Sequence, residues 1–85
     1  MVFKYKPSGV CSREITIDVN EENETVNSVS FVGGCNGNLK GIGALVKGKS
    51  IDEIIEALEG IDCNYKGTSC PDQLAKALTQ IQEQL

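Results

Sequence analysis

The sequence predicts an α+β fold in a single domain over residues 1–85, with a small antiparallel sheet of two or three strands followed by three helices. Three observations predict this fold. Apolar and polar side chains alternate between residues 11 and 19, which is typical of a strand with one buried face. From residue 39 onward the apolar side chains recur every three or four positions, as on one face of a helix. Two Ser-x-x-acidic motifs, beginning at Ser50 and Ser69, are typical of helix starts.

The strands are expected at the amino-terminal end of the chain. Within residues 11–19 the odd positions form the apolar face, and Cys11 shares that side. A polar turn at residues 20–24 separates this strand from a β-branched segment at 25–32, so we expect an antiparallel hairpin. The side chains expected to share one face of its second strand are Val29 and Phe31. Residues 2–5 are expected to add a further strand.

The first helix is expected to follow the glycine-rich run that begins at residue 33 and to end at Gly48. Its apolar face carries Leu39, Ile42 and Val46. Gly41 and Gly43 lie inside this helix, and each disfavours it by about 1 kcal/mol relative to alanine. We therefore expect another part of the molecule to approach this backbone closely, and a second helix is favoured over a ligand.

The second and third helices are expected to begin with capping boxes. In the first box the Ser50 hydroxyl and the Glu53 carboxylate each accept a hydrogen bond from the other residue's backbone, and Gly60 ends the helix. Its apolar face carries Ile51, Ile54, Ile55 and Leu58. Ser69 and Asp72 are expected to form the second box, so Asp72 is interpreted as a cap. The apolar face of the third helix carries Leu74, Ala77, Leu78, Ile81 and Leu85.

The composition argues against several classes of function. A net charge of −4 disfavours broad contact with nucleic acid, where clustered Lys and Arg neutralise phosphates. No apolar run is long enough to span a bilayer and no segment has the layout of a signal peptide, so we expect no membrane association and a cytoplasmic location. The sequence contains no histidine, which removes the usual general base. We therefore expect no catalytic residues, and a binding domain rather than an enzyme.

Four cysteines are the candidate metal ligands: Cys11, Cys35, Cys63 and Cys70. In the cytoplasm an even number of cysteines is more typical of metal ligation, redox chemistry or structural thiols than of disulfides. Cys35 and Cys70 stand at expected helix starts, where unpaired N–H groups favour a thiolate or a bound anion. No Cys-x-x-Cys pair is present, so a zinc site requires distant segments to converge. For Cys11 the strand alternation favours a place in the core.

A second candidate site follows the hairpin. It consists of Gly33, Gly34, Cys35, Asn36, Gly37 and Asn38, together with Ser69 and Cys70 at the start of the third helix. A glycine-rich loop between a strand and a helix is a setting in which backbone N–H groups hold phosphate. We therefore expect a phosphate-bearing ligand, either a nucleotide or a flavin, as the alternative occupant. A purely structural role is equally open, in which the glycines form a sharp turn and Asn38 caps the helix.

The two motifs together resemble a known family. Residues 33–39 and the run Thr-Ser-Cys-Pro-Asp at 68–72 are similar to the TSCPD domain, which occurs as a short stand-alone bacterial protein. A similar domain lies near the C-terminus of some adenosylcobalamin-dependent ribonucleotide reductases. The resemblance implies that Cys35, Cys63 and Cys70 bind a metal or serve redox chemistry. It does not imply reductase activity, because the chain has no room for the barrel that holds the radical chemistry.

Three functions remain open, in this order. The first is a small binding or accessory domain that holds a metal, zinc above all, between its cysteines. The second is binding of a phosphate-bearing ligand at the glycine-rich loop and the start of the third helix. The third is a thiol redox protein that uses Cys63 and Cys70. A homodimer through the last helices is a further expectation, because so small a core gains from association.

Overall fold

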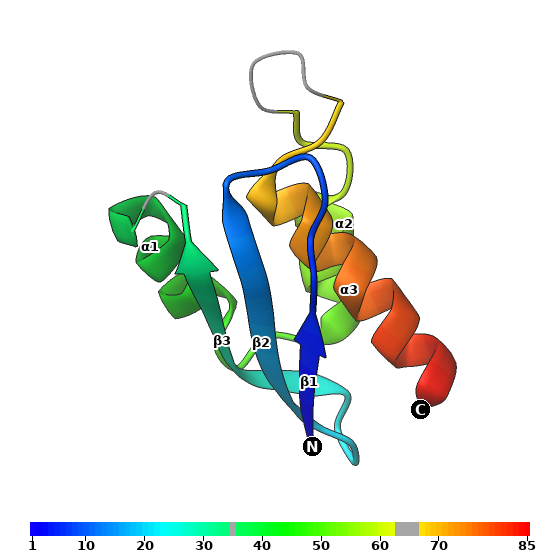
Figure 1. Ribbon diagram of the computed structural model, residues 1–85. Helices are drawn as coiled ribbons and strands as arrows, with labels where there is room; N and C mark the ends of the chain where they lie inside the picture. Colours follow the sequence, from blue (N-terminus) through cyan, green and yellow to red (C-terminus); the bar gives the residue numbers. More distant parts are fainter. Residues whose placement is uncertain (35, 63–66) are drawn as a thin grey trace.

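The computed structural model describes residues 1–34, 36–62 and 67–85. Within these ranges it contains a three-stranded antiparallel sheet with the strand order β1-β2-β3, followed by three helices (Figure 1). The elements are β1 (Val2–Tyr5), β2 (Ser12–Asn20), β3 (Thr25–Gly33), α1 (Asn36–Val46), α2 (Ile51–Leu58) and α3 (Cys70–Gln84). The predicted α+β fold is therefore confirmed.

The expected antiparallel hairpin is formed by β2 and β3. Ile15 pairs with Phe31, and Ile17 pairs with Val29. β1 extends the sheet on the other side of β2, where Tyr5 pairs with Ile15. The two isoleucines are fully buried and their partners are partly buried, because β2 is the central strand.

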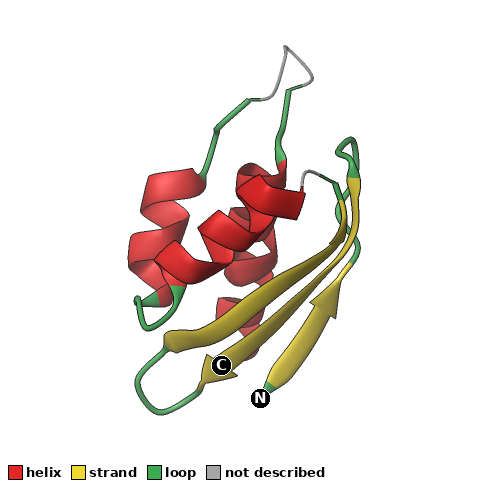
Figure 2. Cartoon of the chain, turned by 90° about the vertical axis from the view of Figure 1, so that its left-hand side faces the viewer, coloured by secondary structure: helices red, strands yellow, loops and turns green. Residues whose placement is uncertain are grey.

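The helices lie on the same side of the sheet (Figure 2), and the core fills the space between them and the strands. Its buried members are Ile15, Ile17, Val19, Val26, Val46, Ile51, Ile54, Leu74, Ala77, Leu78 and Ile81. The apolar face predicted for the third helix is confirmed as far as Ile81. Leu85 is 44% exposed, because α3 ends one residue before it. Among the described residues, none of the helices combines the length and the hydrophobicity that a membrane span requires.

Gly43 lets α1 lie against the edge of the sheet. Among the described strands β3 pairs with β2 alone, and α1 lies beside it (Figure 1). A Cβ atom placed on Gly43 would be 2.8 Å from the carbonyl oxygen of Val29, which is too close for any larger residue. The predicted close approach is confirmed, but the expected neighbour was wrong: it is a strand rather than a helix. Around Gly41 no atom lies within 4 Å of such a Cβ.

The ends of α2 follow the sequence prediction. The Glu53 N–H donates to the Ser50 hydroxyl over 3.1 Å, and the Ser50 N–H donates to the Glu53 carboxylate over 3.2 Å. These two bonds satisfy backbone donors that have no partner inside the helix. After the helix, Gly60 has a φ of 85°, a conformation that glycine adopts without a steric penalty. The chain therefore turns sharply here, toward the segment that precedes α3.

Candidate functional site

Two cysteines from distant parts of the sequence meet at the start of α3. The Sγ atoms of Cys11, just before β2, and Cys70, the first residue of α3, are 3.9 Å apart. The hydroxyl of Ser12 lies 3.2 Å from the Cys70 Sγ, within hydrogen-bond distance. Cys11 is exposed and Cys70 is only 8% exposed. The pair therefore has one thiol open to solvent and one that is almost covered.

The core position expected for Cys11 was wrong. The pairing of β2 with β3 is irregular between Ser12 and Glu14, so the strict alternation of sides starts only after that point. Ser12 is buried instead, and Cys11 lies outside the strand. The irregular pairing thus turns the Cys11 thiol away from the core and toward α3.

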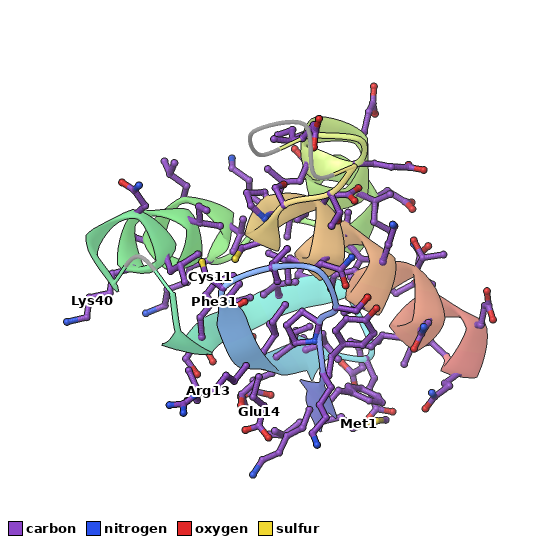
Figure 3. All side chains as sticks on the ribbon, turned by 45° about the horizontal axis from the view of Figure 1, so that its top comes forward. Met1, Cys11, Arg13, Glu14, Phe31 and Lys40 are labelled. Atoms are coloured by element: carbon purple, nitrogen blue, oxygen red, sulfur yellow. The ribbon has the colours of Figure 1, made fainter. Side chains whose placement is uncertain are left out.

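The two thiols open into a groove of about 500 Å³ between α1 and α3. Figure 3 labels Cys11 between these two helices. α1 contributes Gly37, Asn38, Gly41 and Leu45 to the groove, and the start of α3 contributes Ser69 and Cys70. None of the described residues that line it is charged. The two helix starts that the sequence singled out therefore do face a common space.

Cationic side chains border a different groove. Lys40 and Lys47 line a space of about 420 Å³ between α1 and β3, together with the hydroxyl-bearing residues Ser28 and Ser30. Figure 3 shows Lys40 extending away from the body of the protein. A phosphate group bound between the two helix starts would thus have no lysine or arginine among the described lining residues.

Only part of the glycine-rich loop is described. Gly33 and Gly34 have φ values of 82° and 78°, which favour glycine. A Cβ on Gly34 would lie 3.1 Å from the Cys11 Sγ and 2.8 Å from the Leu39 side chain, so this loop passes directly beside the exposed thiol. α1 begins at Asn36 rather than after Asn38, so the expected cap at Asn38 was wrong.

The other two candidate ligands, Cys35 and Cys63, lie outside the described residues. Within residues 1–34, 36–62 and 67–85 no group of three or more Cys, Asp or Glu side chains is arranged to hold a metal ion. The described part of the predicted set is therefore the pair of Cys11 and Cys70.

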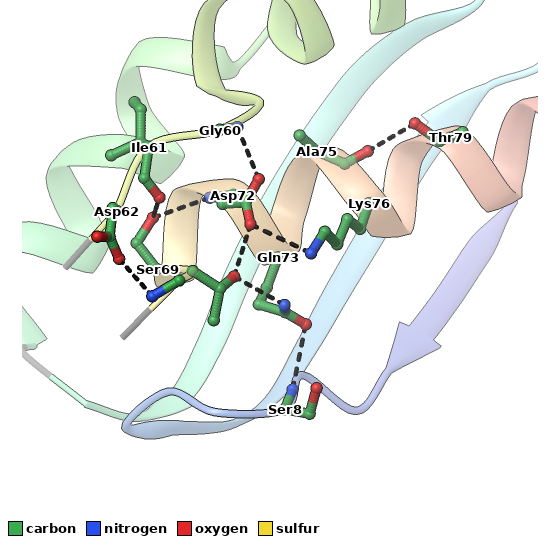
Figure 4. A network of polar contacts seen from close by, with 12 residues as sticks. Ser8, Gly60, Ile61, Asp62, Ser69, Asp72, Gln73, Ala75, Lys76 and Thr79 are labelled. Atoms are coloured by element: carbon green, nitrogen blue, oxygen red, sulfur yellow. Dashed lines mark hydrogen bonds and ion pairs between the residues drawn. The ribbon is translucent and has the colours of Figure 1, made fainter. Parts of the chain in front are cut away.

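The Asp72 carboxylate connects the end of α2 to the start of α3 (Figure 4). It is 3% exposed and accepts hydrogen bonds from the Gly60 N–H over 2.7 Å and from the Thr68 hydroxyl over 2.6 Å. The Lys76 ammonium lies 3.4 Å away. The Thr68 bond is the main cause that holds the pKa of Asp72 below its ordinary value, with the Gly60 N–H and Lys76 acting the same way and burial opposing them.

Ser69 caps α3 as predicted, but Asp72 does not return the bond as a capping box requires. The Ser69 hydroxyl accepts from the Asp72 N–H over 3.1 Å and donates to the Ile61 carbonyl over 2.6 Å. Because the Asp72 carboxylate bonds to Gly60 and Thr68 instead, the expected second capping box was wrong. These residues join the two ends of the connection between α2 and α3.

Gln73 extends this network to the other end of the chain, and the sequence prediction missed it. Its side-chain oxygen accepts from the Ser8 N–H over 3.1 Å and from the Tyr5 hydroxyl over 3.4 Å. Its amide group donates to the Thr68 hydroxyl over 2.9 Å. These bonds join the segment between β1 and β2 to α3, and Cys11 lies at the end of this segment, next to Cys70. The only signal in the sequence for a buried Gln73 side chain is its position directly after the Thr-Ser-Cys-Pro-Asp run.

The comparison with known families agrees with these motifs. The family model described as TSCPD domain matches residues 3–82, which is nearly the whole chain of 85 residues. No curated protein and no solved structure matches the chain. The matched range includes every described residue that lines the groove and every residue named in the network around Asp72. The chain belongs to the TSCPD domain family.

Proposed function

We propose that this protein is a small binding or accessory domain that holds a metal ion, zinc above all, with Cys11 and Cys70 as two of its thiolate ligands. The observation that carries this proposal is the 3.9 Å separation of the two Sγ atoms. In a tetrahedral site with Zn–S bonds of about 2.3 Å, two thiolates lie about 3.8 Å apart. The two sulfurs therefore have the spacing of zinc ligands without any rearrangement of the backbone.

The chemistry of the donor set also supports a soft metal. Thiolates favour zinc and similar ions over magnesium or calcium, which take oxygen ligands. The remaining ligands in this proposal are Cys35 and Cys63, which are not among the described residues. Cys35 directly follows Gly34 in the sequence, and Gly34 passes beside the Cys11 thiol. Four thiolates would complete a closed, structural type of site.

A phosphate-bearing ligand, a nucleotide or a flavin, is the second candidate. It is supported by the common groove of about 500 Å³ that Gly37 and Asn38 share with Ser69 and Cys70. Two features rank it below the metal. The Ser69 hydroxyl already donates to the Ile61 carbonyl, and the described lining of the groove carries no positive charge.

Native mass spectrometry of anaerobically prepared protein, with an absorption spectrum, tests the two candidates together. The metal proposal expects zinc at one ion per chain, which is lost from Cys11→Ser and from Cys70→Ser. Ser30→Ala, at an exposed position on β3, serves as the control and should keep the ion. Zinc removal by a chelator should also lower the melting temperature.

Two results would count against metal binding. One is that both cysteine variants keep a full complement of tightly bound zinc, which would place the ion elsewhere. The other is that the protein carries no metal and co-purifies with a nucleotide or a flavin, which would favour the second candidate. The same spectrum reports the number of subunits and so tests the expected homodimer.

A further inference from the structure

We propose that Cys11 and Cys70 are also a redox pair, which forms a reversible intramolecular disulfide when the metal-free protein meets a hydroperoxide. This pairing differs from the Cys63–Cys70 pairing considered above. It follows from the described geometry: the two sulfurs are 3.9 Å apart, and both cysteines are free thiols. Bond formation requires the sulfurs to close to about 2.05 Å, a movement of roughly 1.9 Å.

The surroundings of Cys11 make that movement feasible. Cys11 lies outside regular secondary structure, at the end of the bend that contains Gly9 and directly before the first residue of β2. Gly9 has a φ of 72°, and the irregular pairing of β2 begins directly after Cys11. Cys70, by contrast, is held at the start of α3 between the capping residue Ser69 and the rest of the helix. The exposed cysteine can therefore move toward a partner that stays in place.

Because Cys11 is exposed and Cys70 is buried, Cys11 reacts with the hydroperoxide first and Cys70 reacts second. The exposed Cys11 thiolate attacks one oxygen of the hydroperoxide, the O–O bond breaks, and the products are a Cys11 sulfenic acid and an alcohol or water. The Cys70 thiolate then attacks the sulfenic sulfur, the S–O bond breaks, and hydroxide leaves as the S–S bond forms. One thiol proton ends in the alcohol or water released in the first step, and the other converts the hydroxide released in the second step to water. The peroxide is reduced by two electrons, which the two sulfurs supply.

Oxidation and metal binding would then exclude each other at this pair. A sulfur in a disulfide is no longer a thiolate, and metal ligation by cysteine requires the thiolate. This consequence rests on the proposed function, whereas the disulfide itself does not. Peroxide would thus release the metal from a loaded protein, and a dithiol would restore its binding.

The test uses the full chain after removal of metal by a chelator, treated with hydrogen peroxide at equal concentration. We expect the intact mass to fall by two hydrogen atoms and to return after reduction with a dithiol. Cleavage after lysine and arginine puts each of the four cysteines on a different peptide, so the linked pair can be assigned directly. The expected cross-link joins the peptides that carry Cys11 and Cys70.

A variant in which Cys35 and Cys63 are replaced by serine isolates the described pair and should oxidise like the unmodified chain. In Cys11→Ser no loss of two hydrogens should occur in that background. A cross-link from Cys70 to Cys35 or Cys63 would overturn the proposal, as would over-oxidation of Cys11 with Cys70 left as a thiol. Because these measurements use metal-free protein, the disulfide can fail while zinc binding stands, and the reverse also holds. If a variant does not fold, the cross-link found in the unmodified chain still decides which cysteines are paired.

Discussion

Replacing Asp72, near the start of α3, with alanine is expected to destabilise the protein by several kcal/mol, about 3 to 5. The Asp72 carboxylate is almost fully buried and accepts bonds from Gly60 and Thr68, which belong to the two ends of the connection between α2 and α3. In Asp72→Ala both donors would lose their acceptor. Figure 4 shows the contacts of this carboxylate with Gly60 and Lys76.

The size of the effect follows from those contacts. A hydrogen bond to a charged group contributes about 1.5 to 3 kcal/mol, and a buried donor without a partner costs about 1 to 3 kcal/mol. The ion pair with Lys76 adds little, because the lysine side chain is 52% exposed and such pairs contribute about 0 to 1 kcal/mol. We therefore expect the free energy of unfolding to fall by about 3 to 5 kcal/mol. A domain of this length has a total of only about 4 to 13 kcal/mol.

Urea unfolding at neutral pH measures this loss through the shift of the midpoint at constant slope. The matched control is Asp62→Ala. Asp62 accepts a bond of the same length, 2.7 Å, from the Gly67 N–H, but it is exposed, so its loss should cost less than about 1 kcal/mol. If the two variants lose the same stability, or if Asp72→Ala loses less than about 1 kcal/mol, the reasoning from burial is wrong.

The remaining predictions concern pH, a pair of glycines and a helix cap. The pKa of Asp72 is lower in the folded protein than in the unfolded chain, so its contribution to the free energy of unfolding should be complete above about pH 4. This contribution should be lost as the pH falls through the folded pKa. Urea midpoints between about pH 2 and 6 should therefore fall less steeply with decreasing pH in Asp72→Ala than in the unmodified chain. Gly43→Ala should destabilise the protein by about 1 to 3 kcal/mol because its Cβ meets the Val29 carbonyl, whereas Gly41→Ala should stabilise it by about 0.5 to 1 kcal/mol. If both substitutions shift the melting temperature in the same direction, the close approach of Gly43 to Val29 does not decide stability. Ser50→Ala should cost about 1 kcal/mol by the loss of a helix cap, and an unchanged urea midpoint would show that the cap contributes nothing.

The parts of the fold that depend on local patterns could be predicted from the sequence. Alternation at residues 15–19 and the capping box at Ser50 require only neighbours in the chain, and both are confirmed. Predictions failed where a distant contact decides the outcome. The neighbour of Gly43 is a strand edge, which no local pattern identifies. The side to which Cys11 points depends on an irregular pairing between β2 and β3, and the sequence carries no signal for it.

The candidate site could be predicted in the same partial way. Helix-start signals identified Cys70 and Ser69, and the structure adds Cys11 as the neighbour of Cys70. The segment before β2, which leads to Cys11, is joined to α3 by the bond from the Ser8 N–H to the Gln73 side chain. A glutamine within a helix is usually exposed, so its burial could be recognised only once the distant segment was in view.

The residues of the pentapeptide that names the family have different roles. Thr68, Ser69 and Asp72 use their side-chain polar groups in hydrogen bonds within the chain, whereas Cys70 lines the groove beside the Cys11 thiol. A related sequence that conserves the first, second and fifth letters but replaces the cysteine should therefore inherit the architecture and lack the sulfur chemistry. Whether a homologue also carries a cysteine equivalent to Cys11 is thus a better guide to its biochemical role than the pentapeptide itself.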